Sequence, residues 1–592
     1  MRDLISLFGR VLAIFPAGGR RFVLTNAWLL ASLSILDVVA LGLFAAIISP
    51  IAAGQPVSLP IIGLLSNTGL VLAIVLVCVL MVLKGVLAVL VTWWGIRRIA
   101  RYEVAIGDRL FRGYINAPWL TRLRRNSADM LQFSSSGVDA AINAFVLPGA
   151  TLIGEAVSLI LVIATLALVQ PMLALVTLLY MAALGLALYL WAAKRSQRAG
   201  EEYVTATVRT SRLVLEIVGA MKEVTLRNKE AEVASVVEAS RTRTANARAQ
   251  MTFLSGIPRY VLESGLVGGF LVVGGAGYLM GGLPQALSAI ALFGLAGFRI
   301  APSVVRAQTT LSTMIANSYF VRRLLTEVAD TELAALDATA ATDAPVPPGA
   351  ERLRLEHVTF RYPVGDEVAI KDVSIDIALG STVAFVGESG SGKSTIVDLI
   401  LGLIEPSEGR IVIDDAPLSG MRTAWRQRVA YVPQEVALFD ASIAQNVALT
   451  WSDDFDRDRV RSALERAHLW DVVGNREGGI DAHIGERGIA LSGGQRQRLG
   501  IARALYTDPL VLVMDEATSA LDSRTEAAVT ESVAELDGEV TVIVVAHRLS
   551  TIKHSDRIFF LRGGELAGSG TFDELVAAFP DFAEQAQLAG LA

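Results

Sequence analysis

Cysteine is almost absent from this sequence, and charged residues are few. A lone Cys78 among 592 residues excludes a disulfide framework and a zinc cluster held by cysteines. Because Cys78 lies in an apolar run, we interpret it as a small buried hydrophobic residue rather than a reactive thiol. Charged residues make up 19% of the chain, against about 25% in soluble domains. The chain is therefore not an ordinary soluble enzyme.

Hydrophobic residues are abundant instead, at 53% of the chain, and the mean hydropathy is +0.50. This composition excludes a disordered chain and a fibrous repeat. The formal net charge is −6, so we expect no nucleic-acid partner. The composition is typical of a membrane protein that carries a soluble part.

Long apolar runs occur only before residue 340. A helix that crosses a bilayer needs about 20 apolar residues. We predict six spanning helices at Phe22–Pro50, Gly69–Ile96, Ala140–Val169, Met172–Ala193, Met251–Met280 and Leu283–Arg306. The N-terminus and the segments 97–139 and 194–250 are rich in basic residues, so the positive-inside rule predicts that both termini are cytoplasmic.

The two basic segments have few helix breakers and are too long for ordinary loops. We predict that the spans continue as helices beyond the membrane and turn near Asn116–Trp119 and Gly219–Val224. A solvated loop is the alternative.

The composition changes again after the last predicted span. Residues 331–349 are rich in Ala, Thr, Asp and Pro and read as a linker. Beyond them, short β-type runs alternate with helical stretches, which indicates an α/β domain with a largely parallel sheet. We therefore predict a helical membrane domain over 1–330, a linker over 331–349 and an α/β domain over 350–592.

A glycine-rich motif carries the chemistry of the α/β domain. Residues 387–394 read GESGSGKS and match GxxxxGK[ST] between an apolar strand and a helical stretch, which is the context of a P-loop. Its glycines let backbone amides surround phosphate oxygens. We predict an ATP site in which Lys393 reaches the β- and γ-phosphates and the Ser394 hydroxyl binds Mg²⁺. The predicted phosphate-binding residues are Gly387, Glu388, Ser389, Gly390, Ser391, Gly392, Lys393, Ser394 and Thr395.

Two carboxylates follow a second apolar strand, in the sequence LVLVMDE at 510–516. Four apolar residues in a row indicate a strand buried on both faces, and its C-terminal end faces the nucleotide crevice of such a sheet. We predict that Asp515 holds the Mg²⁺ shell and that Glu516 polarises the attacking water as a general base.

Between these motifs, residues 491–495 read LSGGQ, which resembles the signature motif of ABC transporters. The resemblance implies that Ser492, Gly493, Gly494 and Gln495 contact the nucleotide held by the P-loop of another subunit. It also implies nucleotide-site roles for four further residues: Tyr362 stacks on adenine, Gln434 reaches Mg²⁺, Asp522 belongs to the D-loop, and His547 contacts the γ-phosphate.

Six spans fused to one nucleotide-binding domain resemble a bacterial half-exporter of the inner membrane, with that domain in the cytoplasm. The family arrangement puts the P-loop and LSGGQ on different surfaces of one domain, so two chains are needed for a closed site. We expect a homodimer; a heterodimer with another chain is the alternative.

Basic residues inside the predicted spans bear on the cargo, because ionisable groups in a bilayer are costly. Lys84, Arg259 and Arg299 lie in three different spans and are candidates for binding an anionic group such as a pyrophosphate. Internal pairing with Asp37 or Glu263, or snorkelling to the interface, is the structural alternative.

Three segments, at 114–131, 258–263 and 298–306, resemble parts of bacterial lipid-linked oligosaccharide flippases. This resemblance implies a polyprenyl-pyrophosphate-linked glycan as cargo, with Arg259 and Arg299 binding the pyrophosphate, and an external helix at 58–66. The function we predict is ATP-driven export or flipping of an amphiphilic, anionic lipid. The alternatives are a multidrug, lipid A or peptide exporter and, in a different class, a gated channel or regulator.

Overall fold

Contacts between residues divide the protein into two units. The first comprises Met1–Ala117 and Thr121–Asp337, and the second comprises Pro118–Leu120 and Ala338–Ala592. The computed structural model describes most of the chain, namely residues 2–52, 58–59, 63–64, 67–124, 127–169, 171–339, 344–363, 368–485, 488–516, 538–546, 549–588 and 591.

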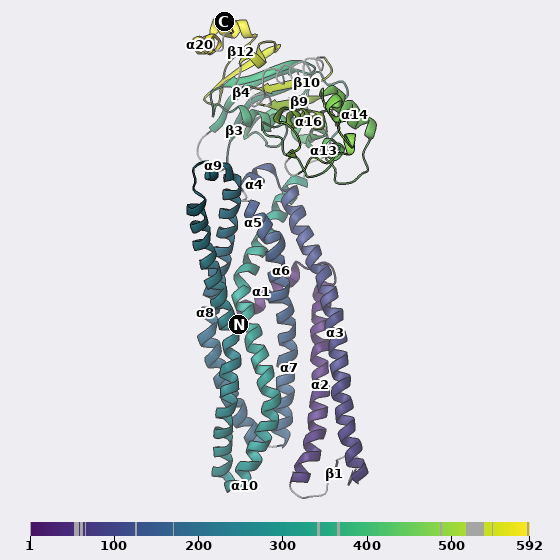
Figure 1. Cartoon of the computed structure of the whole chain (residues 1–592), viewed down its shortest axis with the longest axis vertical. Helices are drawn as coiled ribbons and strands as arrows, with labels where there is room; N and C mark the ends of the chain where they lie inside the picture. The colour runs from purple at the N-terminus through teal and green to yellow at the C-terminus, as the bar shows by residue number, and fades with distance from the viewer. Residues whose placement is uncertain are drawn as a thin grey trace. The chain divides into compact units, whose positions relative to one another are not determined.

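The first unit is built almost entirely from helices, several of them far longer than a bilayer is thick (Figure 1). Two π-helical turns join α5, α6 and α7 into one nearly continuous rod. Gly281 and Gly282 break α10 into two helical arms. The helices are α1 (Arg2–Ala13), α2 (Gly19–Ala52), α3 (Asn67–Asn116), α4 (Trp119–Leu123), α5 (Ser127–Gln132), α6 (Val138–Ala141), α7 (Leu147–Val169), α8 (Pro171–Gly219), α9 (Met221–Leu226) and α10 (Glu230–Thr339).

Four stretches of the described residues are long and apolar enough to cross a membrane, and they coincide with the predicted spans two to five. The predicted spans Phe22–Pro50 and Leu283–Arg306 lie in α2 and in the second arm of α10, where many side chains are outside the described residues. The four stretches are Gly69–Asn116, Phe133–Leu161, Leu175–Gly219 and Glu230–Leu279.

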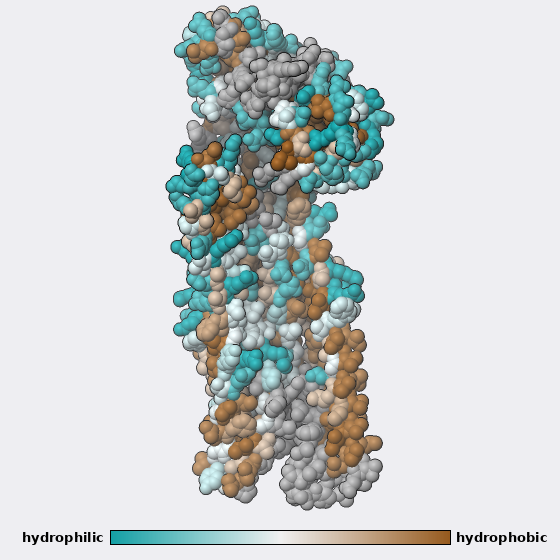
Figure 2. Space-filling view, in the orientation of Figure 1, coloured by the Kyte–Doolittle hydropathy of each residue, from teal (hydrophilic) through white to brown (hydrophobic). Residues whose placement is uncertain are grey.

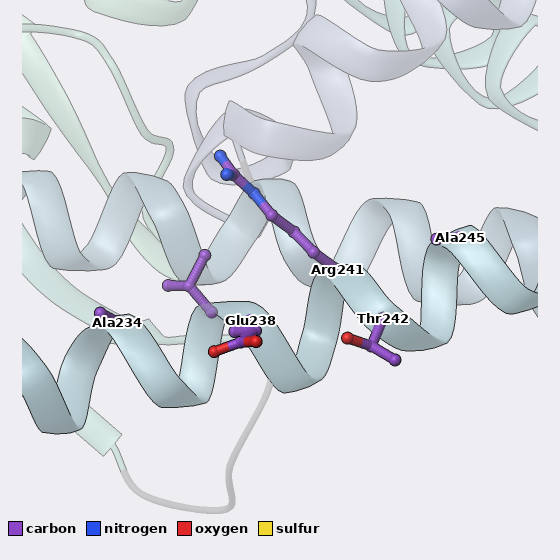
Figure 3. Close-up of a pocket in the computed structure, with 6 residues that line it drawn as sticks. Ala234, Glu238, Arg241, Thr242 and Ala245 are labelled. Carbon is purple, nitrogen blue, oxygen red and sulfur yellow. The ribbon is translucent and has the colours of Figure 1, made fainter.

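The two basic segments are helical rather than looped, since α3 continues to Asn116 and α8 to Gly219 before the chain turns. A groove of about 740 Å³ between α8 and α10 is lined by polar side chains that include Thr210, Arg241 and Arg248. A second groove, of about 480 Å³, lies along α10, and Figure 3 shows Glu238, Arg241 and Thr242 projecting from that helix. The charged side chains among these lining residues, Glu238, Arg241 and Arg248, belong in water rather than in hydrocarbon.

The surface of α3 is apolar where the helix is expected to meet lipid. Val71, Leu72 and Val82 are exposed, and Figure 2 shows hydrophobic residues along the flank where Figure 1 draws α3. Cys78 is exposed on the same helix, so our interpretation of it as buried is wrong. An apolar neighbourhood indicates burial in a soluble core, but on a membrane helix it equally suits a lipid-facing surface.

The expected external helix at 58–66 is also wrong for the residues described there. Ser58–Leu59 (β1) pairs antiparallel with Gly63–Leu64 (β2). Gly63, at the start of β2, disfavours a helix. The segment 331–349 differs in part from a simple linker, because α10 continues through Thr339.

The second unit contains two sheets. A six-stranded sheet has the order β12-β11-β5-β10-β9-β8, parallel except for β12, and a four-stranded antiparallel sheet has the order β4-β3-β6-β7. The strands are β3 (Arg352–Arg361), β4 (Val368–Ala378), β5 (Thr382–Gly387), β6 (Glu408–Ile413), β7 (Ala416–Pro417), β8 (Val429–Val432), β9 (Val511–Asp515), β10 (Thr541–Val545), β11 (Arg557–Arg562) and β12 (Glu565–Gly570).

Helices surround these sheets. Figure 1 draws α13, α14 and α16 together beside β9 and β10. The helices of the second unit are α11 (Lys393–Ile400), α12 (Arg422–Arg426), α13 (Ile443–Ala448), α14 (Arg457–Arg466), α15 (Trp470–Gly474), α16 (Gly493–Leu505), α18 (Leu549–Ile552), α19 (Phe572–Ala578) and α20 (Pro580–Leu588).

Alternate residues of the parallel strands face two different cores. On β5, Val383 and Phe385 pack in the core that contains α11, whereas Ala384 and Val386 pack in the core that contains α16. The strands β9 and β10 alternate in the same way. Because successive side chains of a strand point to opposite faces, α11 and α16 cover opposite faces of the six-stranded sheet. We call these the α11 face and the α16 face.

The helices α8 and α10 approach each other so closely at Gly200 that a larger residue does not fit there. A Cβ atom at Gly200 would collide with the backbone carbonyl of Ala316. We expect Gly200→Ala to destabilise the protein by roughly 1–3 kcal/mol, because the two helices must move apart. The thermal unfolding midpoint of the detergent-solubilised protein measures this loss.

The matched control is Gly256→Ala, since a Cβ atom there meets no heavy atom within 4 Å. In a helix this exchange is neutral or stabilising by up to about 1 kcal/mol. Equal midpoints for the two variants would contradict the close helix contact.

Candidate functional site

Three of the predicted nucleotide-site segments follow parallel strands and meet at one edge of the six-stranded sheet. The glycine-rich loop follows β5, Asp515 and Glu516 end β9, and Gln434 follows β8. The carboxyl ends of parallel strands form the ligand crevice of such sheets. The topology therefore gathers residues that are up to about 130 positions apart in the chain.

The glycines of the loop are required by its shape. Gly387 and Gly392 have φ angles of +148° and +102°, in the region that other residues rarely adopt. A Cβ atom at Gly387 would collide with the carbonyl of Leu561, and one at Gly392 would lie 2.6 Å from Ile370 Cδ1. The loop is therefore a backbone-lined cradle that leads directly into the N-terminus of α11.

The polar side chains of the loop suit an anionic ligand. Lys393 Nζ donates to the carbonyls of Gly387 and Glu388, at 2.8 and 2.9 Å. Ser391 Oγ is buried and has no hydrogen-bond partner within the protein, and Ser394 is exposed. Lys393 donates only to neutral carbonyls in these bonds, and the buried Ser391 hydroxyl lacks a hydrogen-bond partner. Both groups are therefore suited to binding a phosphate.

The two carboxylates at the end of β9 are each held by a neighbour from β8 or the loop after it. Tyr431 Oη donates to Asp515 Oδ2 at 3.0 Å, and Gln434 Nε2 donates to Glu516 Oε2 at 3.0 Å. Glu516 has a φ of +49°, a left-handed conformation that is costly for a non-glycine residue. Its N–H donates to Val545 O at 2.9 Å, which fixes that conformation.

The negative charges of Asp515 and Glu516 act on Lys393 of the glycine-rich loop. Burial lowers the pKa of Lys393, and Glu516 and Asp515 partly offset that effect. Burial raises the pKa of Asp398, on the same helix, to about 6. Burial also raises the pKa of Tyr431, so its hydroxyl keeps its proton and remains a donor to Asp515.

Tyr362, the residue expected to stack on adenine, lies beside the P-loop helix. Its hydroxyl is 3.1 Å from Thr395 Oγ1, and its ring packs edge-on against Phe360 with centroids 5.0 Å apart. The structure therefore connects Tyr362 to the predicted phosphate-binding residue Thr395.

The LSGGQ residues begin α16. Ser492 caps the helix by accepting from the Gln495 N–H, and the Gln495 side chain accepts from the Ser492 N–H at 2.9 Å. This capping box leaves Ser492 and Gly493 exposed. Because α16 covers one face of the sheet and α11 the other, the structure does not bring LSGGQ together with the P-loop of the same chain.

Asp522 and His547 lie outside the described residues, as do the side chain of Arg299 and that of Asp37. Arg259 is two-thirds exposed and pairs with Glu263, one turn further along α10, at 2.9 Å.

Lys84 lies in a group of charges that the sequence did not connect. Glu155 of α7 accepts hydrogen bonds from Arg306 Nε and Nη2 of α10, at 2.5 and 3.1 Å. Lys84 of α3 interacts electrostatically with Glu155 and Arg306. We call Lys84, Glu155 and Arg306 the charge cluster.

Sequence reasoning missed Glu155, Arg306 and Tyr431 as site residues. The signal for Glu155 was present, since it is a carboxylate inside an apolar run in the same way that Lys84 is a cation inside one. Arg306 stands at the end of its predicted span and was not singled out. No sequence signal identifies Tyr431, because its role depends on the register of β8 against β9.

Two family descriptions match the chain. The description "ABC transporter transmembrane region" covers residues 8–263, and "ABC transporter" covers residues 370–519. The full chain also superposes on a bacterial Atm1-family ABC exporter with ATP bound, with a TM-score of 0.76 over 96% of this chain and 97% of the other. At 24% identity, this similarity establishes the fold.

Two curated relatives are named ATP-dependent lipid A-core flippase. The one from Ralstonia nicotianae is 48% identical over 227 residues, covering 38% of each chain. The one from Chromohalobacter salexigens is 37% identical over 323 residues, covering 51% of this chain and 56% of the relative. The chain thus matches between two fifths and about half of the length of these relatives.

The two matched regions are a membrane region and a nucleotide-binding region of the same family, in one polypeptide with the exporter fold. The chain belongs to the ABC transporters, as an exporter-type helical membrane domain fused to an α/β nucleotide-binding domain.

Proposed function

We propose that the protein hydrolyses ATP and couples the reaction to export or flipping of an amphiphilic lipid across the bacterial inner membrane, with both termini in the cytoplasm. The observation that carries the proposal is the gathering of the P-loop, Asp515, Glu516 and Gln434 at one sheet edge. The matched family descriptions support the same class of activity.

The backbone cradle from Gly387 to Gly392 and the side chains of Lys393, Ser394 and Thr395 would hold the ATP phosphates. Mg²⁺ would bind Ser394, Gln434 and Asp515, and it would supply positive charge beside the phosphates. Within the described residues, no group of three or more His, Cys, Asp or Glu side chains could hold a metal ion. This fits a site in which the nucleotide itself contributes ligands.

Glu516 is the general base of the proposed hydrolysis. The Gln434 amide orients one of its oxygens, and the fixed left-handed backbone holds the residue at the strand end. A carboxylate held in this way accepts a proton from water more effectively than a freely rotating one. His547 and Asp522 complete the proposed nucleotide site.

Two copies of the chain would form the active assembly. The P-loop and LSGGQ belong to opposite faces of one sheet, so a nucleotide held by one chain would meet Ser492, Gly493, Gly494 and Gln495 of a second copy. A homodimer with twofold symmetry satisfies this requirement twice.

The first test replaces the proposed general base. Glu516→Gln keeps the hydrogen-bonding size of the side chain but removes its basicity. We expect ATP turnover to fall at least about 100-fold, while nucleotide-bound dimers accumulate. Steady-state ATPase assays and size-exclusion chromatography with ATP measure the two effects.

Glu539→Gln is the matched control, because Glu539 is an exposed carboxylate just before β10, at the opposite end of the strands. It should leave turnover unchanged. Ordinary ATPase rates in Glu516→Gln would refute the role of Glu516.

A second test addresses Tyr431, which we propose orients Asp515 for the metal. Tyr431→Phe removes one hydrogen bond to a carboxylate. We expect the Mg²⁺ concentration for half-maximal ATPase activity to rise roughly three- to tenfold. ATP affinity measured in EDTA should not change, because Tyr431 does not contact the P-loop glycines.

Tyr506→Phe is the control, since the Tyr506 ring packs under Arg459 on α14, away from the sheet edge. A Mg²⁺ dependence in Tyr431→Phe equal to that of the unmodified protein would remove Tyr431 from the site.

For the cargo, the finer proposal is a polyprenyl-pyrophosphate-linked oligosaccharide or a similar anionic lipid, bound by Lys84, Arg259 and Arg299. The relatives named lipid A-core flippase favour lipid A as a second candidate. Both lipids carry phosphate groups and both suit a cationic site. Multidrug and peptide export require no such site.

The cargo test compares stimulation of the ATPase by a polyprenyl-pyrophosphate glycan and by lipid A. Alanine variants of Lys84, Arg259 and Arg299 should each weaken stimulation by the true cargo several-fold while basal turnover persists. Arg195→Ala, which removes a cation stacked on Trp191 in the same unit, is the control. Undiminished stimulation in all three variants would dismiss anion recognition.

A further inference from the structure

One exposed face of α3 changes from apolar to basic at a tryptophan. Trp93, Arg97 and Arg101 are four residues apart, so they share this face, and all three are exposed. The Arg97 guanidinium stacks on the Trp93 ring, 4.8 Å from its centroid. Toward the start of the helix the same face carries exposed apolar side chains, namely Val79, Val82, Val86 and Leu90.

The helix α2 repeats this order in the opposite chain direction. Arg21 is exposed near the start of α2, and Trp28, two turns further on the same face, is 67% exposed. Ile35 and Val39 continue that face and are exposed as well. Two helices that follow each other in the chain therefore carry the same series of arginine, tryptophan and apolar side chains.

The two faces lie on the same side of the α2–α3 pair, whose helices run side by side (Figure 1). The Phe22 ring of α2 is 4.8 Å from the Trp94 ring of α3 and lies under the Arg98 guanidinium, at 5.9 Å. Arg21 precedes Phe22 and Arg97 precedes Arg98, and one residue is a rotation of about 100° around a helix. Because the helices are antiparallel, the two rotations have opposite senses and bring both arginines to the same side of the pair.

Arginines gather at the basic end of this surface. Within the described parts of the chain, none of them forms an ion pair with a carboxylate. Stacking on Trp93 occupies the flat face of the Arg97 guanidinium and leaves its N–H groups available to an anion. The exposed arginines are Arg20, Arg21, Arg97, Arg98 and Arg101.

We propose that this surface, which we call the arginine–tryptophan face and define by Arg21, Trp28, Trp93, Arg97 and Arg101, binds an anionic phospholipid of the surrounding bilayer. The arginines bind the phosphate, the tryptophans lie at the boundary between headgroups and hydrocarbon, and the acyl chains pack on the apolar part of the same face. A free anion would use only the basic end. The inference goes beyond the cargo, and only the assignment to the cytoplasmic leaflet rests on the proposed function.

The test counts lipids bound to the full-length protein by native mass spectrometry, with the protein in dodecyl maltoside and without nucleotide. The probes are phosphatidylglycerol, phosphatidylcholine with the same acyl chains, and glycerol phosphate. We expect phosphatidylglycerol to bind at least about fivefold more tightly than phosphatidylcholine. Equal affinity for the two lipids would overturn recognition of the charge, and equal binding of glycerol phosphate would overturn the assignment to a lipid.

The variant that locates the site removes one arginine from each helix. Arg21→Gln combined with Arg97→Gln should lower the affinity for phosphatidylglycerol at least about fivefold and leave phosphatidylcholine binding unchanged. The matched control is Arg227→Gln, which removes an exposed arginine after α9 and should change neither affinity. An unchanged affinity for phosphatidylglycerol in the double variant would overturn the proposal.

The same spectra report the oligomeric state. Dissociation of dimers in the double variant would assign the face to a contact between two copies of the chain and would overturn the lipid site. If the double variant does not fold, as judged by its size-exclusion profile, the two single variants replace it. Each should lose about threefold in affinity for phosphatidylglycerol, and no loss in either would overturn the proposal.

Failure of this inference and failure of the proposed function are distinguishable. Since the titration uses no ATP, a failed lipid result with normal ATPase activity counts against the arginine–tryptophan face alone. Loss of the expected Glu516→Gln effect would count against the proposed function alone.

Discussion

The six-stranded sheet imposes one constraint from which the proposed assembly follows. Alternate side chains of its strands pack into two separate hydrophobic cores. The helix α11, which follows the P-loop, therefore covers one face of the sheet, and α16, which begins at LSGGQ, covers the other. A single chain can gather phosphate-binding amides, a lysine and two carboxylates at one edge of the sheet. Its own LSGGQ helix packs on the opposite face of the sheet from the P-loop helix. The period-two alternation of Val383 to Val386 thus supports, through packing, the proposal that a second copy completes the nucleotide site.

The membrane unit obeys a different constraint, which is the cost of charge in hydrocarbon. Apolar side chains on the surface of α3 are acceptable there because lipid replaces the protein core as their environment. A charged side chain is less costly there when it pairs with one of opposite charge. The described residues include an ion pair within one helix and an ion pair between two helices. Arg259 and Glu263 form an ion pair within α10, whereas Glu155 of α7 forms one with Arg306 of α10.

Sequence reasoning predicted the parts of the site that lie in continuous motifs. Gly387–Thr395, the two residues Asp515 and Glu516, and the LSGGQ helix start are local patterns whose chemistry depends on spacing along the chain. Tyr431 was not predictable, because its contact with Asp515, 84 residues further along the chain, arises from the pairing of two parallel strands. Cys78 was misjudged for a related reason, since hydropathy does not distinguish a protein core from a lipid-facing surface.

The same distinction explains why the predicted set Lys84, Arg259 and Arg299 was only a partial description of the membrane charges. Sequence locates a charge along a helix but not around it, and partners on other helices decide what that charge does. The pair between Glu155 and Arg306 links α7 to α10, so any ligand that separates the pair alters an interaction between two helices. A ligand that separates Arg259 from Glu263 alters only the surface of one helix. An anion that binds at the charge cluster can therefore influence helix packing, which local neutralisation along a single helix cannot do.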